Sequence, residues 1–262
     1  MDHYNHDVAV QFTRLLGIVR ELRVRCPWDR EQTIESLSRH LIEEAYEALD
    51  EIASGNAHAL ADELGDLLSQ ILFIALIAQE SRRFSITAMI SAASDKLIRR
   101  HPHVYSDTKA ESVGEVIENW RRIKAQERRE AGKTSALDGI ARALPALMRA
   151  EKIGVRARQA GMDWPNLQAV LAKVREELAE TEEALARGDE SAVAAELGDT
   201  MLALANAPRF VGHDAEETLR RACDKFVIRF GAVEQIAAER GLELAQLSGE
   251  QVESVWQEAK RK

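Results

Sequence analysis

Two acidic motifs occur twice in this sequence with the same spacing. Residues 43–47 read Glu-Glu-x-x-Glu and residues 63–66 read Glu-x-x-Asp, and residues 176–180 and 196–199 repeat both motifs. On a helix, residues three or four positions apart share one face, so each motif brings its carboxylates together. Carboxylates that are crowded in this way repel one another unless a cation lies among them. Oxygen ligands without Cys or His favour Mg²⁺, with Mn²⁺ as the alternative.

The repeated motifs predict one metal site in each half of the chain. The predicted ligands are Glu44, Glu47, Glu63 and Asp66 in the N-terminal half, and Glu177, Glu180, Glu196 and Asp199 in the C-terminal half. For a single copy, a solvated acidic helix face is the competing interpretation. The repetition of the same spacing argues against that interpretation. A di-iron bundle would need Glu-x-x-His, which these motifs do not contain.

Basic residues at matching positions indicate a phosphate-bearing ligand. Lys96 and Arg100 stand four residues apart, and Lys225 and Arg229 repeat them. Arginine can bind a phosphate through two hydrogen bonds, and lysine acts as a point charge. Cations near the end of a helix also compensate its dipole, and that alternative stays open.

An aromatic residue and a cation also recur together. Trp120 and Lys124 are matched by Trp256 and Lys260, in each case four residues apart. This pairing is suited to stacking on a nucleotide base while a phosphate is held nearby. Packing in a hydrophobic core is the alternative role for both tryptophans.

The elements that must position these residues are predicted to be helices. Ala, Leu, Glu and Arg are abundant, aromatic residues make up only 5 % of the chain, and alternating Val/Ile runs are missing, so the sequence predicts an all-α fold. Helical periodicity and capping signals place helices at residues 7–25, 34–54, 57–79, 85–100, 112–129, 145–160, 166–187, 190–207, 215–240 and 249–261. Residues 26–29 and 101–103 are expected to interrupt them.

The second half of the chain repeats the first. Residues 41–68 align without a gap with residues 174–201, and the identities include the acids and the turn glycines Gly55 and Gly188. An internal repeat of this kind predicts duplicated domains. The polar, glycine-containing run after residue 129 is the predicted linker. We therefore expect modules at 1–129 and 144–262, joined by residues 130–143.

Composition limits the remaining possibilities. The formal charge of −9 disfavours duplex nucleic acid as a partner, but permits a small anion that is bound through metal and local basic residues. Two cysteines, Cys26 and Cys223, do not form a disulfide framework or a zinc pattern. The polar N-terminus and the lack of an 18-residue apolar run predict a cytoplasmic protein that does not enter the membrane.

Together these features resemble the MazG family of nucleoside triphosphate pyrophosphohydrolases, within the all-α NTP pyrophosphatase superfamily. The likeness covers nearly the whole chain. It depends on the two acidic motifs and on the runs Cys26-Pro27-Trp28-Asp29, residues 94–104, residues 144–147, Lys225-Phe226 and Arg229-Phe230. The resemblance implies two tandem modules, each like a four-helix bundle. It also implies a homodimer and Mg²⁺-dependent hydrolysis of NTP or dNTP to the monophosphate and pyrophosphate.

The resemblance also implies roles for individual residues. The C-terminal module usually carries the activity, so Glu177, Glu180, Glu196 and Asp199 would bind Mg²⁺, and Glu176 would belong to the same shell or orient water. Either Glu176 or Glu43 could accept the proton of the attacking water. The nucleotide would be contacted by Lys173, Lys225, Arg229, Trp256 and Lys260, and in the N-terminal module by Lys96, Arg100, Trp120 and Lys124.

Some residues depart from the family pattern. Ile228 replaces the first Arg of a pair, Thr200-Met201 replaces Leu-Leu, and Pro208 is expected to kink the helix that follows Asp199. By its motifs alone, the N-terminal site is the complete one. Two alternatives stay open: a same-fold enzyme that is narrow for dUTP or phosphoribosyl-ATP, and a regulator that binds nucleotide or metal without catalysis.

Overall fold

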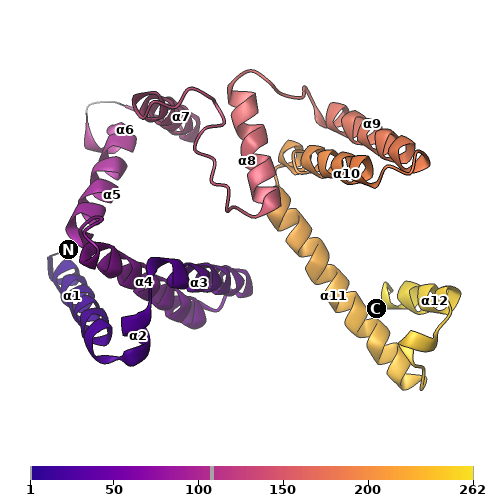
Figure 1. The fold of residues 1–262 in the computed structure, drawn as a ribbon, viewed down its shortest axis with the longest axis horizontal. Coiled ribbons are helices and arrows are strands. Elements are labelled where there is room, and N and C mark those ends of the chain that lie inside the picture. The colour runs from indigo at the N-terminus through magenta and orange to yellow at the C-terminus, as the bar shows by residue number, and fades with distance from the viewer. Residues whose placement is uncertain (1, 107–108, 262) are drawn as a thin grey trace. The chain divides into compact units, whose positions relative to one another are not determined.

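The computed structural model describes residues 2–106 and 109–261, and helices are the regular secondary structure of these ranges (Figure 1). Two compact units are present, Met1–Ala125 and Gln126–Lys262. The helices of the first unit are α1 (Asp2–Arg25), α2 (Pro27–Glu31), α3 (Ile34–Ser54), α4 (Ala57–Glu80), α5 (Ile86–Arg100), α6 (Pro102–Tyr105) and the first part of α7 (Val113–Glu130). Those of the second are α8 (Ala146–Gln159), α9 (Leu167–Ala186), α10 (Glu190–Leu204), η1 (Pro208–Val211), α11 (Ala215–Glu239), η2 (Leu244–Gln246) and α12 (Gly249–Ala259).

In the first unit, α3 and α4 pack against each other as a helical hairpin. Thr33 and Ser36 form a reciprocal capping box at the start of α3. Gly55 ends α3 with a φ of 73°, a left-handed conformation that glycine adopts without a steric penalty. Asn56 then caps α4 by accepting a hydrogen bond from the Ala59 amide. This sharp turn fixes the register in which the two acidic helices face each other.

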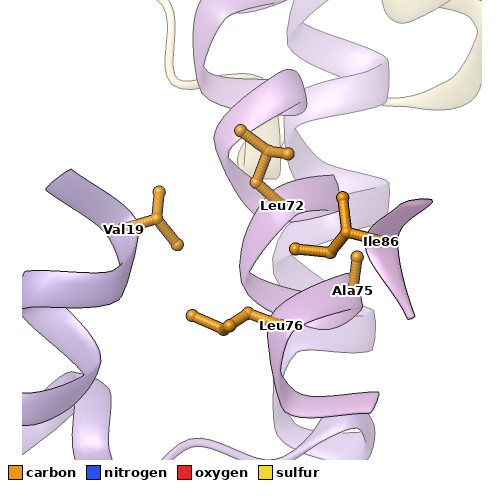
Figure 2. Packing of buried hydrophobic residues seen from close by; sticks show 5 residues of the cluster. All are labelled: Val19, Leu72, Ala75, Leu76 and Ile86. Atoms are coloured by element: carbon orange, nitrogen blue, oxygen red, sulfur yellow. The ribbon is translucent and has the colours of Figure 1, made fainter. Parts of the chain in front are cut away.

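The core of the first unit joins α1, α4 and α5. Val19, Leu72, Ala75, Leu76 and Ile86 are buried and cluster together (Figure 2). The three α4 residues follow a three- and four-residue spacing, so they share one face of the helix. Full burial of a side chain such as Leu72, which is 1 % exposed, contributes about 1.5–3 kcal/mol. Packing against α1 and α5 therefore fixes the position of α4 through its buried face.

Arg23 anchors the short helix α2. Its guanidinium pairs with Glu80 at 2.8 Å and donates hydrogen bonds to the carbonyls of Asp29, Arg30 and Gln32. One side chain thereby satisfies the last carbonyls of α2, which have no partner within the helix. Arg23 thus connects α1, α2 and the C-terminal end of α4.

The second unit repeats the helical hairpin with α9 and α10. Asn166 caps α9, Gly188 adopts a φ of 71° in the turn, and Asp189 caps α10 by accepting a hydrogen bond from the Ala192 amide. Gly188 and Asp189 are the counterparts of Gly55 and Asn56 in the sequence repeat. The same turn chemistry therefore builds both hairpins.

Helix α8 packs on α10 and α11 at a position where only glycine fits. A Cβ atom on Gly154 would lie 1.7 Å from Oδ1 of Asn206, which is 1 % exposed and follows α10. The Glu151 carboxylate accepts a hydrogen bond of 3.0 Å from the Ala215 amide at the start of α11. Helix α8 thus fixes the end of α10 and the start of α11.

Helix α11 carries α12 at its C-terminal end, whereas α8 lies near its N-terminal end (Figure 1). Val233, Ile236, Val255 and Ala259 form the core between α11 and α12. Arg240 adds a 2.6 Å ion pair with Glu258.

The all-α prediction is confirmed, and a helix is present at each of the ten predicted locations. The predicted interruptions are confirmed, because α1 ends at Arg25 and α5 ends at Arg100. Residues 27–31 and 102–105 form additional short helices, because proline is compatible with the first turn of a helix. Two predicted bounds differ clearly from the structure. Helix α1 begins at Asp2 rather than at residue 7. Helix α10 ends at Leu204, so Pro208 does not kink it and instead begins η1. Residues 131–145 between α7 and α8 contain no helix, and the linker at 130–143 stays a prediction. Across the described ranges, no helix is long and apolar enough to span a membrane.

Candidate metal centres

The N-terminal hairpin brings three carboxylates together. One oxygen each of Glu44 on α3 and of Glu63 and Asp66 on α4 lie within 4.8 Å of one another. Glu44 and Glu63 are partly buried and Asp66 is exposed. Ligand oxygens around a single divalent cation fall within such distances of one another, and carboxylates are the donors that Mg²⁺ prefers.

Burial and neighbouring like charges raise the pKa values of two carboxylates in this cluster. Burial raises the pKa of Glu44, and repulsion from Asp66 and Glu47 raises it further. The pKa of Glu63 is raised for the same reasons, first by burial and then by Glu47 and Asp66. Protonation or a bound cation would relieve this repulsion.

Glu43 is set apart from this cluster by cations of its own. It accepts a 2.7 Å hydrogen bond from Nε of Arg39, and its other oxygen lies 3.1 Å from Nδ1 of His40. The hydrogen bond from Arg39 is the main cause of its lowered pKa. Glu43 is therefore already paired with Arg39 and lies against His40.

The C-terminal hairpin forms the equivalent group. Oxygens of Glu177 on α9 and of Glu196 and Asp199 on α10 lie within 4.8 Å of one another. Glu177 is only 5 % exposed, so its carboxylate has little contact with water. A carboxylate that is buried to this degree needs a partner.

Lys173 is that partner. Its Nζ lies 2.6 Å from Oε1 of Glu176 and 2.7 Å from Oε1 of Glu177. The hydrogen bond from Lys173 is the main cause of the lowered pKa of Glu177. In contrast, burial raises the pKa of Glu180, and repulsion from Glu177 adds to this shift. Lys173 therefore compensates the charge of Glu177, whereas the environment of the neighbouring Glu180 disfavours its charged form.

Three of the four predicted ligands in each half lie together. The fourth members lie outside the groups of three. Glu47 is close enough to raise the pKa values of Glu44 and Glu63, and Glu180 is close enough to affect the pKa of Glu177. The full ligand sets therefore stay a prediction.

The predicted phosphate contacts of the second unit line a groove. Lys225 and Arg229 on α11 and Lys260 after α12 surround a volume of about 420 Å³, together with Arg221 and Asp224. This groove lies at the α12 end of α11. The sequence analysis did not include Arg221. It lies four residues before Lys225, which in turn lies four residues before Arg229, so helical spacing could have identified it.

The two tryptophans are partly buried, and each has a lysine over its ring. Lys260 lies 5.7 Å from the centre of Trp256, which also contacts Phe226 and the α11–α12 core. Lys124 lies 4.5 Å from the centre of Trp120. His101 meets Trp120 edge-on at 5.2 Å, next to Arg100 at the end of α5. Packing therefore accounts for part of each tryptophan surface, and base stacking stays a prediction.

Comparison with known proteins gives a consistent result. The sequence profile described as the MazG nucleotide pyrophosphohydrolase domain matches residues 32–105 and 166–233, which contain the two carboxylate hairpins. The nucleoside triphosphate pyrophosphohydrolase of Escherichia coli K12 is 46 % identical over 96 % of this chain and 97 % of its own length.

Two Thermotoga maritima proteins are also similar. The nucleoside triphosphate pyrophosphohydrolase/pyrophosphatase MazG is 40 % identical over 97 % of both chains. The crystal structure of a mazG-related protein aligns with 43 % of this chain and 98 % of its own, at 27 % identity and a TM-score of 0.40.

Proposed function

Because the chain belongs to the MazG nucleotide pyrophosphohydrolase family, we infer that it is a nucleoside triphosphate pyrophosphohydrolase, cleaving between the α and β phosphates to give the monophosphate and pyrophosphate. The observation that carries this proposal is the duplicated carboxylate hairpin within the matched segments. A regulator that only binds nucleotide would not need to keep both sets of acids. Acids in both halves therefore favour an enzyme.

The donor chemistry fits a hard divalent cation. Each group of three offers carboxylate oxygens within 4.8 Å of one another. Burial, and then repulsion from neighbouring carboxylates, raises the pKa values of Glu44, Glu63 and Glu180, and a bound cation would offset both effects. We propose Mg²⁺, with Mn²⁺ as a substitute. The ligands would be the groups of three, completed by Glu47 and Glu180.

When bound, Mg²⁺ supplies charge neutralisation at the phosphates and lowers the pKa of a coordinated water. The protein residues position the substrate and take up the proton. In the second unit, Glu176 would accept the proton from the attacking water as the oxygen attacks phosphorus and pyrophosphate leaves. In the first unit, Glu43 would take the same role, and it pairs with Arg39 much as Glu176 pairs with Lys173.

The cationic groove would hold the phosphates. Lys225, Arg229 and Lys260 line the groove with positive charge. The partly exposed ring of Trp256 lies next to Lys260. Arginine and lysine at this spacing can contact neighbouring phosphate oxygens. A protein with formal charge −9 needs such a local positive surface to bind a nucleotide. A nucleotide is available in the cytoplasm, which we propose as the location.

Within one chain, the groove and the carboxylates lie at different parts of the second unit. The carboxylates are on the α9–α10 hairpin, and the groove is where α12 packs on α11 (Figure 1). We propose a homodimer in which the groove of one copy faces the carboxylates of the other. Exposed apolar residues on both elements, including Leu185 and Met201 on the hairpin and Val227 and Ile228 on α11, support such an interface.

Pyrophosphate release from a panel of canonical and modified triphosphates, with Mg²⁺, tests the activity. Glu180→Gln should abolish turnover if the second unit is the working site, and Glu47→Gln tests the first unit in the same way. Glu182→Gln is the matched control, because it removes an exposed carboxylate from the same helix. Lack of pyrophosphate release from every triphosphate would overturn the proposal.

Complementation tests the shared site. Glu180→Gln and Arg229→Gln should each be inactive alone. In a mixed dimer, one site combines an intact hairpin with an intact groove, so a refolded equal mixture should regain about one quarter of wild-type turnover. A site formed within one chain would give no recovery.

A further inference from the structure

The two carboxylate clusters differ in what neutralises them. In the second unit, Nζ of Lys173 lies 2.7 Å from Glu177, one of the three clustered carboxylates, and 2.6 Å from Glu176. The Glu177 side chain is 6 % exposed, so Lys173 is a close partner of a carboxylate that water hardly reaches. The lysine thereby holds one of the two oxygens of a carboxylate in the group of three.

A lysine side chain is positively charged at neutral pH, and the ammonium of Lys173 contacts both Glu176 and Glu177. The positive charge of Lys173 weakens the electrostatic attraction between Glu177 and a metal ion, and it also repels the metal ion directly. Removal of the lysine charge should therefore strengthen metal binding.

The first unit has a different arrangement at the equivalent positions. Aligned through the sequence repeat, His40 takes the place of Lys173 and Glu44 takes the place of Glu177. His40 and Arg39 both contact Glu43, which is outside the group of three. Within the described residues, Glu44 forms no ion pair with a lysine or arginine, in contrast to Glu177. The protein itself therefore compensates the negative charge of Glu44 less than that of Glu177.

We propose that Lys173 is a built-in countercharge that weakens binding of a divalent cation at the C-terminal cluster, so that the N-terminal cluster has the higher intrinsic metal affinity. This inference rests on the proposed metal-dependent function. Lys173 acts through Glu177 and Glu176 as a positioning residue. A metal ion can bind all ligands of the C-terminal cluster only when the Lys173 ammonium moves away from Glu177. The phosphates of a bound nucleotide could then pair with this ammonium.

The test measures Mn²⁺ binding to the full chain without nucleotide, by electron paramagnetic resonance of the free ion. Each cluster is isolated by silencing the other one: Glu63→Gln with Asp66→Asn leaves the C-terminal cluster, and Glu196→Gln with Asp199→Asn leaves the N-terminal cluster. We expect the isolated N-terminal cluster to bind Mn²⁺ more tightly.

Substitutions at the two equivalent positions then isolate the countercharge. Lys173→Met should tighten Mn²⁺ binding at the C-terminal cluster by about three- to tenfold, the scale of a partly exposed charged hydrogen bond. Lys173→Arg should restore weak binding, and His40→Lys should weaken binding at the N-terminal cluster. The matched control is Arg175→Met, which removes an exposed cation from the same helix. The differences should shrink at high ionic strength.

A purely structural lysine would give another result. Lys173→Met would then lower thermal stability and leave Mn²⁺ affinity unchanged or weaker, and this outcome would overturn the inference while the proposed function stands. If neither isolated cluster of the otherwise native chain bound Mn²⁺, the metal-dependent function itself would fail. Circular dichroism of each variant shows that the helices are retained.

Discussion

Substitution of Gly154 by alanine should disrupt the contact between α8 and the end of α10. The new Cβ would lie 1.7 Å from Oδ1 and 2.7 Å from Cγ of Asn206. Asn206 cannot turn away freely, because it is 1 % exposed and its Nδ2 donates a 2.9 Å hydrogen bond to the Leu202 carbonyl. Helix α8 or the end of α10 must therefore move.

The magnitude follows from two contributions. Overpacking of a buried site costs about 1–3 kcal/mol. Loss of the hydrogen bond from Asn206 to Leu202 adds about 0.5–1.5 kcal/mol. We expect Gly154→Ala to lower the free energy of unfolding by about 1.5–4.5 kcal/mol. Because α10 carries Glu196 and Asp199, metal-dependent turnover at the second unit should fall as well.

Urea denaturation followed by circular dichroism measures the change, with Gly231→Ala as the control. A Cβ on Gly231 meets nothing within 4 Å, and alanine in this exposed helical position should stabilise by up to about 1 kcal/mol. In a double-mutant cycle, Asn206→Ala should remove most of the penalty of Gly154→Ala. If Gly154→Ala lowered the free energy of unfolding equally in the wild-type and Asn206→Ala proteins, the reasoning would be refuted.

Three further predictions concern the core, the acid response and the α11–α12 contact. Leu72→Ala should lower the free energy of unfolding by about 2–5 kcal/mol in a urea titration, and a loss below 1 kcal/mol would contradict the close packing of its buried site. Hydrogen bonds from Arg221 and then Arg220 lower the pKa of Glu217 below 4.5, so its stabilisation is present above that pH and is lost as the pH falls through the lowered pKa. Glu217→Gln should flatten the acid limb of stability against pH, and an unchanged limb would contradict this assignment. Arg240→Ala should lower the free energy of unfolding by about 0.2–1 kcal/mol, the scale of an exposed ion pair. It should also weaken binding of a non-hydrolysable triphosphate, because the ion pair with Glu258 holds α12 beside the groove. Unchanged nucleotide affinity would contradict nucleotide binding in the groove.

Much of the fold could be predicted because local signals agree with the packing. The turn between the acidic helices is an example. Gly55 and Gly188 both adopt left-handed φ, and the following Asn56 and Asp189 both cap the next helix. These are short-range effects of residue type. The grouping of Glu44, Glu63 and Asp66 then follows from helix periodicity and the hairpin alone.

The differences lie where one residue type permits two structures. Proline at positions 27 and 102 marks the end of the preceding helix, as predicted, but it also fits the first turn of a short helix that was not predicted. At position 208 it was expected to kink a helix that in fact ends earlier, at Leu204. The tight fit of Gly154 against Asn206 joins residues distant in sequence, and no local pattern indicates it.

The same limit applies to the site. A repeat of acids is visible in the sequence, but which cation pairs with which acid depends on side-chain geometry. Lys173 reaches the clustered Glu177, whereas His40 at the equivalent position reaches Glu43 instead. A duplicated chain can keep its metal ligands and still change how strongly they attract a metal, because the neighbouring charges set the cost of bringing those carboxylates together. Sequence identity of the acidic motifs alone therefore cannot rank the two sites, and the residues that contact the acids are the ones to compare.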